Sequence, residues 1–425
     1  MLSFKSKINS KRKNIFATLE LGGSKVACAI AKLESTPDQH HPYFKILGMA
    51  QQISKGFKTQ TIIDMDALES SILGAIHTAE ENAKETLSSV YVVIPSATTQ
   101  SFVVKSEIPL AGAEIEDYHL RRLFNLGRNN PVPSTHEVIH VLPKSYTLDN
   151  TVGIKDPKGM VGQILAVELV VIAAPKSLLR NLHLVVGRCH LSIEAFICDA
   201  YASSLSCLIE DEMELGVTVV DIGGSCMSIS CFCEGFLVHT DSILLGGNNI
   251  TYDVARGLST TLIQAERLKT LYGTVITCSS DEREMIYVPQ IGEDVSPYTH
   301  QIPKTQLTFI IKSRVDEMIE MFVKTLLEKK INPRSFEKFV VTGGGAQLPG
   351  VRDLFSQLLR KPVRIGAPPS SLVDNEMLQT PMFSALCGGL YFEWQNYMGQ
   401  QLSYDEKYGS SGVVKNFFSW IKENF

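Results

Sequence analysis

The sequence predicts an α/β protein with two lobes, built from two related halves of the chain. One observation is a strand, an acidic tip, a Gly-Gly turn and a second strand at residues 217–230 (VTVVDIGGSCMSIS), where Asp221 is the tip. The same pattern occurs much earlier, at residues 18–26 (TLELGGSKV), where Glu20 is the tip. A third glycine cluster, at residues 339–350 (FVVTGGGAQLPG), follows another apolar strand. The repeated hairpin indicates two half-molecules that face each other.

Both turns have a composition that suits phosphate. Because glycine has no side chain, its backbone N–H group can approach an anion closely. The acidic tips Glu20 and Asp221 can hold a hydrated Mg²⁺ ion nearby, and Lys25 follows the first turn, where it can meet the β- and γ-phosphates. One such hairpin is also an ordinary tight turn, but two of them together favour a nucleoside triphosphate with Mg²⁺.

In their order, the three loops resemble the first phosphate loop, the second phosphate loop and the adenosine loop of the actin/Hsp70/sugar-kinase ATPase superfamily. The resemblance implies an actin-like two-lobed ATPase fold that binds ATP, with Mg²⁺ held through water by Glu20 and Asp221. It places Glu266 and Lys269, at i and i+3 of a predicted helix, on the ribose and adenine; the alternative is a surface ion pair. The residues that it assigns to ATP are Gly22, Gly23, Ser24, Lys25, Gly223, Gly224, Ser225, Gly247, Asn248, Glu266, Lys269, Gly343, Gly344, Gly345 and Gln347.

The composition argues against several other classes of protein. The chain has 425 residues and a formal net charge of −5, which argues against a general nucleic-acid binder. Its nine cysteines lack the spacing of a metal site and indicate reduced thiols. No apolar run approaches the ~18 residues of a membrane-spanning helix, and no signal-peptide core follows the start. We therefore expect a cytosolic protein that is not threaded through a membrane.

Hydrophobic periodicity predicts helices that alternate with strands along most of the chain. The helices are predicted at residues 66–86, 115–128, 176–190, 193–208, 248–257, 259–272, 304–330, 351–359 and 380–394. Between residues 87 and 174 strands dominate and surround a single helix, the one at 115–128. This stretch is predicted to be a compact α+β subdomain inserted into the first lobe.

The insertion and three short segments together resemble the FtsA family of bacterial cell-division proteins, which has a strand-helix-strand-strand subdomain at this point. Glu20 matches the LEIGT-type first loop of the family, and residues 138–143 with 153–157 (VIHVLP and GIKDP) look like its insertion signature. Residues 247–255 (GNNITYDVA) look like its GN-VT-DIA segment. The resemblance covers residues 15–425.

This resemblance implies an ATP-binding scaffold with at most weak ATPase activity, which tethers FtsZ filaments to the cytoplasmic face of the inner membrane at the division site. The implied partners are the C-terminal tail of FtsZ, further copies of the chain in actin-like filaments, the membrane surface, and later division proteins at the inserted subdomain; no nucleic acid is implied. Arg314 and Glu317 lie in the region where the family contacts the FtsZ tail. The alternatives are a PilM-like actin-fold assembly protein and a small-molecule kinase, whose acceptor base we cannot find in the sequence.

The expected domain organisation follows the family. The first lobe takes residues 14–86, 175–212 and a closing helix at 365–396, the inserted subdomain 87–174, the second lobe 213–364, a linker 397–411 and an amphipathic helix 412–425.

The amphipathic helix at 412–425 is the expected membrane anchor. Aromatic and aliphatic residues form one stripe along it, which is typical of a helix that lies in the headgroup plane of a bilayer. The stripe consists of Val413, Val414, Phe417, Phe418, Trp420, Ile421 and Phe425. The alternative is a helix docked on the protein's own core. At the other end, the basic first dozen residues are either a solvated terminus or a second strip that meets anionic lipid.

Residues 136–140 read HEVIH, the pattern of zinc metalloproteases. That chemistry needs a helix, because only there do residues i and i+4 lie ~5–6 Å apart on one face. Pro131, Pro133 and Pro143 flank a β-rich run, so we predict a strand, in which His136 and His140 would lie ~13 Å apart. No zinc site is expected here.

The second turn departs from the DIGGGT-x-D pattern of the family. Ser225, Cys226 and Ser228 stand where the family has a third glycine, the threonine and a second acid. The Cβ of Ser225 can crowd the phosphates, and Ser228 cannot replace a carboxylate near Mg²⁺. We therefore expect ATP binding with slow or absent hydrolysis. Asp199, in the middle of the helix predicted at 193–208, faces either the hinge between the lobes or solvent.

Overall fold

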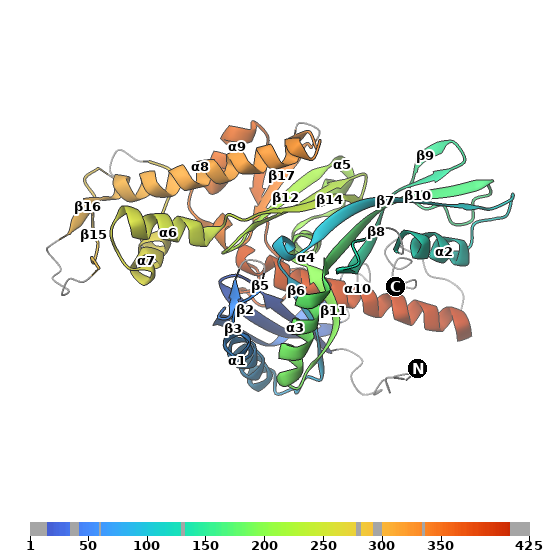
Figure 1. Ribbon diagram of the computed structural model, residues 1–425, viewed down its shortest axis with the longest axis horizontal. Helices are drawn as coiled ribbons and strands as arrows, with labels where there is room; N and C mark the ends of the chain where they lie inside the picture. The colour runs from blue at the N-terminus through green and yellow to red at the C-terminus, as the bar shows by residue number, and fades with distance from the viewer. Residues whose placement is uncertain are drawn as a thin grey trace.

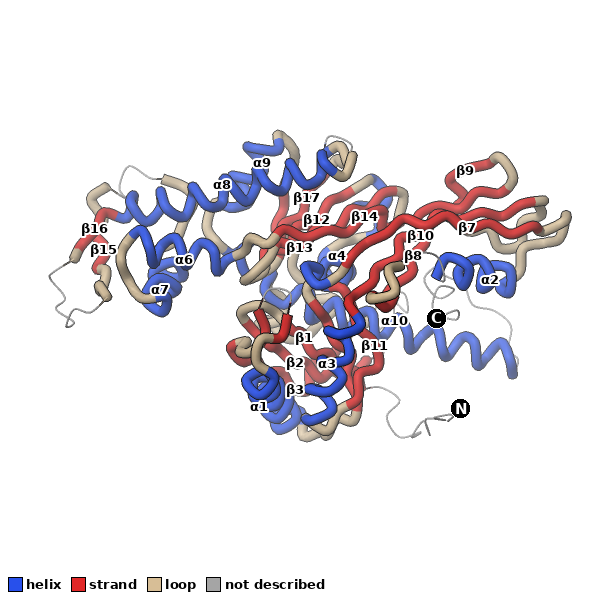
Figure 2. Tube along the Cα trace, viewed as in Figure 1, coloured by secondary structure: helices blue, strands red, loops and turns tan. Residues whose placement is uncertain are grey.

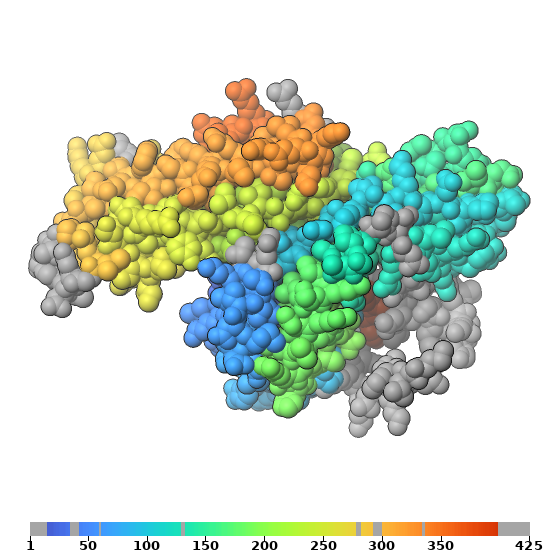
Figure 3. Space-filling model, viewed as in Figure 1, coloured from blue at the N-terminus to red at the C-terminus, as the bar shows by residue number. Residues whose placement is uncertain are grey.

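The computed structural model describes residues 15–34, 42–58, 61–128, 132–277, 282–291, 300–333 and 336–408. These residues form two lobes and an inserted subdomain (Figure 1). In Figure 1 the first lobe lies below the centre, the second extends to the left and the insertion extends to the right. The insertion, coloured cyan to green, projects from the body of the molecule in Figure 3.

The first lobe is built on a five-stranded sheet. In sheet order its strands are β11 (Ser192–Cys198), β6 (Ser89–Ile94), β1 (Ile15–Leu21), β2 (Lys25–Glu34) and β3 (Tyr43–Ile53). The helices α1 (Met65–Ala83) and α3 (Lys176–Arg188) cover one face of this sheet and share an apolar core with it. The helix α10 (Ser384–Tyr408) covers the other face, through residues such as Leu386 and Leu390.

The second lobe is built on another five-stranded sheet. In sheet order its strands are β14 (Phe236–Ile243), β13 (Met227–Cys233), β12 (Val217–Ile222), β17 (Lys338–Thr342) and β18 (Val363–Ile365). Four helices contribute to the apolar core on one of its faces: α6 (Gly247–Gly257), α7 (Leu262–Tyr272), α8 (Lys304–Glu328) and α9 (Val351–Leu359). The helix predicted at residues 304–330 therefore buries its apolar side chains in this core.

The two sheets have the same topology, which agrees with the two related halves predicted from the hairpins. In each lobe the first strand forms an antiparallel hairpin with the second, and the second pairs antiparallel with the third. In each lobe the first strand also pairs in parallel with a later strand, which then pairs in parallel with the last. The acidic-tipped turns therefore occupy equivalent places in the two lobes.

Two packed helices lie between the sheets of the lobes. The helix α4 (Asp199–Cys207) shares a core with β12 and β13 of the second lobe, while α10 packs on β1 and β2 of the first. Their backbones approach closely at Gly388, where a Cβ atom would lie 1.7 Å from the carbonyl oxygen of Ala202. Because only glycine fits this crossing, the lobes are joined through a tightly packed helix pair.

The inserted subdomain is a four-stranded antiparallel sheet with one helix on it. In sheet order the strands are β7 (Gln100–Pro109), β10 (Ile164–Pro175), β8 (His136–Leu148) and β9 (Thr151–Ile154). The helix α2 (Asp117–Arg128) buries Leu120, Leu123 and Phe124 against this sheet. Figure 2 shows its long strands running from the centre of the molecule out to the right-hand edge.

The shorter elements connect these parts. They are β4 (Phe57–Lys58), β5 (Thr61–Ile62), η1 (Ser96–Thr98), α5 (Glu210–Leu215), β15 (Met285–Tyr287), β16 (Gln301–Pro303), η3 (Gly344–Gln347) and η4 (Pro381–Phe383). Within the described residues, no helix is both long enough and apolar enough to cross a bilayer.

Three sequence predictions need correction. The strand β6, which we placed in the insertion, pairs with β1 and β11 and so belongs to the first lobe. The single helix predicted at 193–208 is instead the strand β11 followed by α4, and the change from strand to helix occurs after Cys198. The linker predicted from residue 397 is wrong up to residue 408, since α10 continues to Tyr408. The predicted anchor helix at 412–425 lies outside the described residues.

Candidate nucleotide site

The turn between β1 and β2 holds Glu20 and Lys25 side by side. The turn is closed by a hydrogen bond from the backbone N–H of Gly22 to the carbonyl of Lys25, 2.9 Å long. The Nζ of Lys25 lies 2.6 Å from Oε2 of Glu20, and both side chains are mostly buried. The ammonium also lies 4.9 Å from the centre of the Phe383 ring. A positive and a negative group are therefore fixed at the end of the first hairpin, as the sequence predicted.

The turn between β12 and β13 lies directly against the first turn. Its own closing bond runs from the N–H of Gly223 to the carbonyl of Cys226, 2.9 Å away. A Cβ atom on Gly23 would lie 2.0 Å from Oγ of Ser225, and one on Gly224 would lie 2.4 Å from Oγ of Ser24. Each serine thus fits against a glycine of the opposite turn, and any larger residue at either glycine would force the two turns apart.

The start of α6 caps the second turn. The N–H groups of Gly247 and Asn248 donate to the carbonyls of Gly223 and Gly224, at 2.9 and 2.7 Å. These four residues, all predicted to bind ATP, therefore form one contiguous backbone structure at the N-terminal end of a helix. The positive end of the helix dipole lies at this point and favours a negative charge nearby.

Glu266 and Lys269 are more than the surface ion pair that the sequence left open. Their side chains pair at 2.7 Å on α7, and the Nζ of Lys269 also donates to the carbonyl of Gly247 at 3.2 Å. Thr251 of α6 joins them, since its hydroxyl donates to Glu266 at 2.5 Å and lies 2.9 Å from the Nζ of Lys269. The pair therefore links α7 to the turn that α6 caps.

The third glycine cluster lies beside the tip of β12. Gly343 has a φ of +82°, and a Cβ atom there would lie 2.2 Å from Oδ1 of Asp221. Gly345 is equally close to Ile222, where a Cβ atom would lie 2.3 Å from Cγ2 of its side chain. Gly344 and Gln347 continue along η3 and are exposed. The structure thus brings the three predicted loops together around Asp221.

A second carboxylate, Asp199, lies in the same polar cluster. It begins α4 and is held by Ser96, whose N–H donates to Oδ1 at 2.7 Å, and by Ser228, whose hydroxyl donates to Oδ2 at 2.9 Å. Asp221 is buried and accepts a hydrogen bond from Ser203 of the same helix. Asp199 therefore faces the layer between the lobes, which answers the question that the sequence left open.

Burial makes it unfavourable for Asp199 and Asp221 to ionise at this point. Burial, followed by the neighbouring Asp199 and the more distant Glu20, raises the pKa of Asp221 to about 7. Burial also raises the pKa of Asp199, although its hydrogen bonds from Ser96 and Ser228 oppose the shift. A positive charge placed near these carboxyl groups would offset the repulsion between them.

Sequence reasoning missed the supporting residues of this cluster. Ser228, noted only as the replacement for an acid, orients Asp199, and Ser203 orients Asp221. Thr251 lies within residues 247–255, and the sequence pattern indicated no role for its side chain. The available signal was the run of small residues at 200–206, AYASSLS, which packs tightly between the lobes.

Arg314 and Glu317, predicted to lie in the FtsZ-contact region, pair with each other on α8. The guanidinium of Arg314 also donates two hydrogen bonds to the carboxylate of Asp253 on α6, one of them 3.0 Å long. Arg314 therefore joins two helices of the second lobe, while Glu317 is half-exposed.

The HEVIH segment is a strand, as predicted, because His136 and His140 both lie in β8. His140 is buried, and its Nε2 accepts a hydrogen bond from the N–H of Cys198 at 3.1 Å. Burial lowers the pKa of His140 to about 3, so the ring is neutral and its function is structural. Within the described ranges, no group of three or more His, Cys, Asp or Glu side chains could hold a metal ion.

We therefore expect the purified protein to contain no stoichiometric zinc. Elemental analysis of the wild type and of His140→Gln, which retains a hydrogen-bond acceptor, should give the same near-zero value. Zinc at one equivalent in the wild type that disappears in the variant would contradict the strand geometry.

The burial of His140 also predicts a pH dependence of stability. Its pKa is about 3 in the folded protein and 6.5 ordinarily, so below pH 6.5 only the unfolded chain binds the proton. The free energy of unfolding should then fall as the pH falls, by up to about 1.4 kcal/mol per pH unit from this group. Urea unfolding between pH 7 and 4 should give a shallower slope for His140→Gln. Equal slopes would show that His140 does not titrate in this way.

Comparisons with known proteins agree with the two-lobed fold and its inserted subdomain. A family model described as "Cell division protein FtsA" matches residues 218–388, and one described as "SHS2 domain inserted in FTSA" matches residues 96–173. A protein named "Cell division protein FtsA" from Agrobacterium fabrum is 35% identical over 98% of this chain and 96% of its own length. The protein of that name from Escherichia coli K12 is 27% identical over 98% of this chain and 100% of its own length.

Solved structures show the same fold at much lower identity. The PilM-PilN type IV pilus biogenesis complex matches with a TM-score of 0.62 at 17% identity, covering 89% of this chain and 98% of that chain. MreB5 of Spiroplasma citri, bound to ADP, matches with a TM-score of 0.56 at 13% identity, covering 91% and 98%. The actin-like fold with an inserted subdomain is thus confirmed, and on the evidence of its full-length relatives this chain belongs to the FtsA family of cell division proteins.

Proposed function

We propose that the cluster between the lobes binds ATP with Mg²⁺. The observation that carries this proposal is the meeting of three glycine loops, Lys25 and the carboxyl groups of Asp199 and Asp221 at one place. Backbone N–H groups and an ammonium suit a triphosphate, and a divalent cation would offset the repulsion among Glu20, Asp199 and Asp221. The MreB5 structure bound to ADP has the same fold, which is consistent with a nucleotide in this position.

The proposed roles follow from position. Lys25 meets the β- and γ-phosphates, while Glu20 and Asp221 hold Mg²⁺ through water, and the ion would neutralise charge on the phosphates. Glu266 and Lys269 bind the ribose and adenine, at the point where α7 meets the capped turn. Because the two hairpin turns touch, binding a triphosphate between them requires the lobes to move apart around the α4–α10 layer.

We infer that hydrolysis is slow or absent. The residue facing Asp199 on β13 is Ser228, which donates a hydrogen bond to it and carries no negative charge of its own. Asp199 is the remaining carboxyl group that could orient a water molecule, and burial keeps its pKa raised. The site therefore favours binding over turnover.

On the wider scale, we propose a scaffold that polymerises into actin-like filaments and tethers FtsZ to the cytoplasmic face of the inner membrane at the division site. Residues 412–425 would be the anchor and the surface around Arg314 and Glu317 the FtsZ-tail site, with later division proteins at the inserted subdomain. Membership of the FtsA family and the aromatic stripe of the last residues support this proposal.

The FtsZ contact can be tested without a membrane. A labelled peptide of the FtsZ C-terminal tail should bind the purified protein, and Glu317→Lys should weaken that binding while leaving ATP affinity unchanged. Fluorescence anisotropy of the labelled peptide measures its affinity for the wild type and for the variant. A peptide that binds wild type and variant equally would move the contact away from α8, and one that binds neither would contradict the tether.

A further inference from the structure

The exposed side of α2, in the inserted subdomain, is basic and partly apolar. The helix buries one face in the sheet and turns Arg121, Arg122 and Arg128 outward. Tyr118 and Leu126 lie among them and are 57% and 45% exposed. Five of the outward residues line a shallow depression of about 360 Å³: Tyr118, Arg121, Arg122, Asn125 and Leu126.

The arginines of this face make no ion pair with the residues that the structure describes. Within the described residues, none of Arg121, Arg122 and Arg128 forms an ion pair, whereas Lys158 nearby is paired with Asp117. The acidic side chains of Glu114, Glu116 and Asp117 line an adjoining depression at the N-terminal end of the helix, and Arg121 lies between the two depressions. Towards its C-terminal end, α2 therefore presents the positive charges of Arg122 and Arg128, which have no ion-pair partner in the part of the chain that the structure describes.

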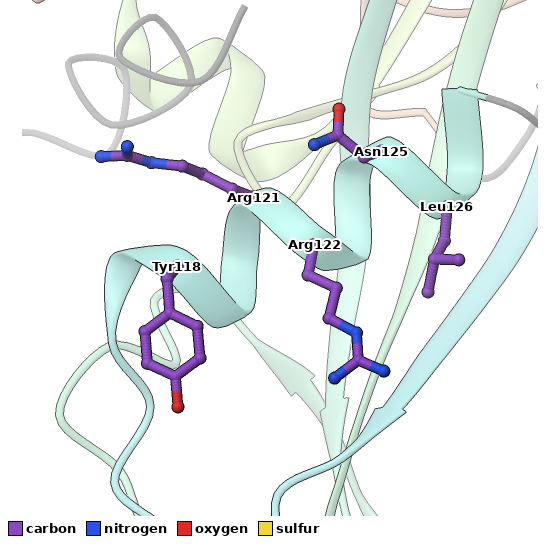
Figure 4. Close-up of a pocket in the computed structure, with 5 residues that line it drawn as sticks. All are labelled: Tyr118, Arg121, Arg122, Asn125 and Leu126. Atoms are coloured by element: carbon purple, nitrogen blue, oxygen red, sulfur yellow. The ribbon is translucent and has the colours of Figure 1, made fainter.

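The side chains are arranged as two stripes. Figure 4 shows Tyr118, Arg122 and Leu126, spaced by four residues, projecting from one side of the helix, while Arg121 extends in another direction. A guanidinium flanked by an aromatic and an aliphatic side chain is suited to the boundary between lipid headgroups and acyl chains. An acidic peptide would use the charge but would bury little of its surface in so shallow a depression.

The position of α2 agrees with a membrane on this side. The insertion and the C-terminal end of α10 both lie at the right-hand end of the molecule in Figure 1. Because α10 leads directly to the proposed anchor at residues 412–425, the anchor would bring this end of the molecule towards the bilayer. A surface held close to the membrane by a tether has a high effective concentration there.

We propose that the exposed face of α2 is a second membrane-contact surface, which binds anionic lipid headgroups through Arg121, Arg122 and Arg128 while Tyr118 and Leu126 enter the headgroup layer. This inference rests on the proposed anchor. The anchor supplies attachment to lipid, and the α2 face adds a preference for anionic lipid and fixes the orientation of the molecule on the membrane.

The test is vesicle co-sedimentation of the full chain with two lipid compositions, pure phosphatidylcholine and phosphatidylcholine with 30% phosphatidylglycerol. Arg122→Gln/Arg128→Gln should weaken binding to anionic vesicles, by about fivefold for each arginine at low salt, and should leave binding to neutral vesicles unchanged. The loss should shrink at 0.5 M salt, where charges are screened. Leu126→Asn should weaken binding at both salt concentrations.

A matched control removes two arginines at the opposite end of the molecule. Arg256→Gln/Arg267→Gln changes exposed residues of α6 and α7 and lowers the net charge by the same amount. It should bind anionic vesicles like the wild type, and all variants should share its melting temperature. If the α2 variants bind anionic vesicles as well as this control does, the α2 proposal is overturned and the anchor stands. If the wild type binds neither vesicle, both proposals are overturned.

Discussion

Replacing Lys25 with alanine is expected to weaken ATP binding by about tenfold to a hundredfold. The variant removes the ammonium that we assign to the β- and γ-phosphates, and a hydrogen bond to a charged group is worth ~1.5–3 kcal/mol. The loss should appear in titration calorimetry with Mg-ATP and should be smaller for a ligand without the γ-phosphate. An unchanged ATP affinity would show that the first hairpin is not a phosphate loop.

The variant also leaves Glu20 without its partner, so stability must be measured beside affinity. The side chain of Glu20 is 12% exposed, and an unpaired, mostly buried acceptor costs ~1–3 kcal/mol or more when charged. A thermal melt without nucleotide separates this cost from the loss of phosphate contacts. Lys32→Ala is the matched control, since Lys32 lies on the same strand but is exposed. It should leave both affinity and melting temperature unchanged.

The second large effect is expected at the C-terminus. Trp420→Glu, or deletion from residue 412 onward, should abolish co-sedimentation with liposomes while ATP binding and FtsZ-tail binding remain. Each large apolar side chain contributes ~1.5–3 kcal/mol when fully buried, but an interfacial helix buries it only partly. The helix must also order its backbone, at ~1–2 kcal/mol per residue, so one charge in the stripe outweighs the marginal net gain.

The polar side of the same helix supplies the control. Ser419 precedes Trp420 but lies outside the stripe, so Ser419→Glu adds the same charge without entering the acyl chains. It should still pellet with liposomes, somewhat more weakly if the lipid is anionic. A chain lacking residues 412–425 that still pellets would contradict the anchor, and one that no longer folds would place this helix in the protein core.

Local chemistry made the two hairpin turns predictable. An acidic tip followed by two glycines specifies a hairpin turn almost by itself, so Glu20, Asp221 and the paired glycines lie where the sequence indicated. The repeat of that hairpin predicted two related lobes, and the proline-flanked HEVIH run predicted a strand.

Features that depend on tertiary packing were not predictable in the same way. Residues 193–208 carry apolar residues along their whole length, and only the pairing of β11 with β6 makes the first part a strand and leaves Asp199 to begin a helix. The end of α10 was placed too early, because weak apolar periodicity does not stop helix-forming residues such as Gln401 and Glu406 from continuing a helix. The link from Thr251 to Glu266 and Lys269 joins two helices, and no spacing along one of them reveals it.

The tethering of FtsZ to a membrane is the central claim, and one reconstitution tests it directly. Purified FtsZ, assembled with GTP, is mixed with anionic liposomes, ATP and either the wild-type protein or Trp420→Glu. The liposomes are then floated, and the FtsZ in the floating fraction is quantified. FtsZ should float with the liposomes only when the wild-type protein is present. The floating amount should increase when the wild-type protein polymerises, because a filament links many membrane anchors. FtsZ that stays in the lower fraction with the wild type, or floats equally with Trp420→Glu, would contradict the account.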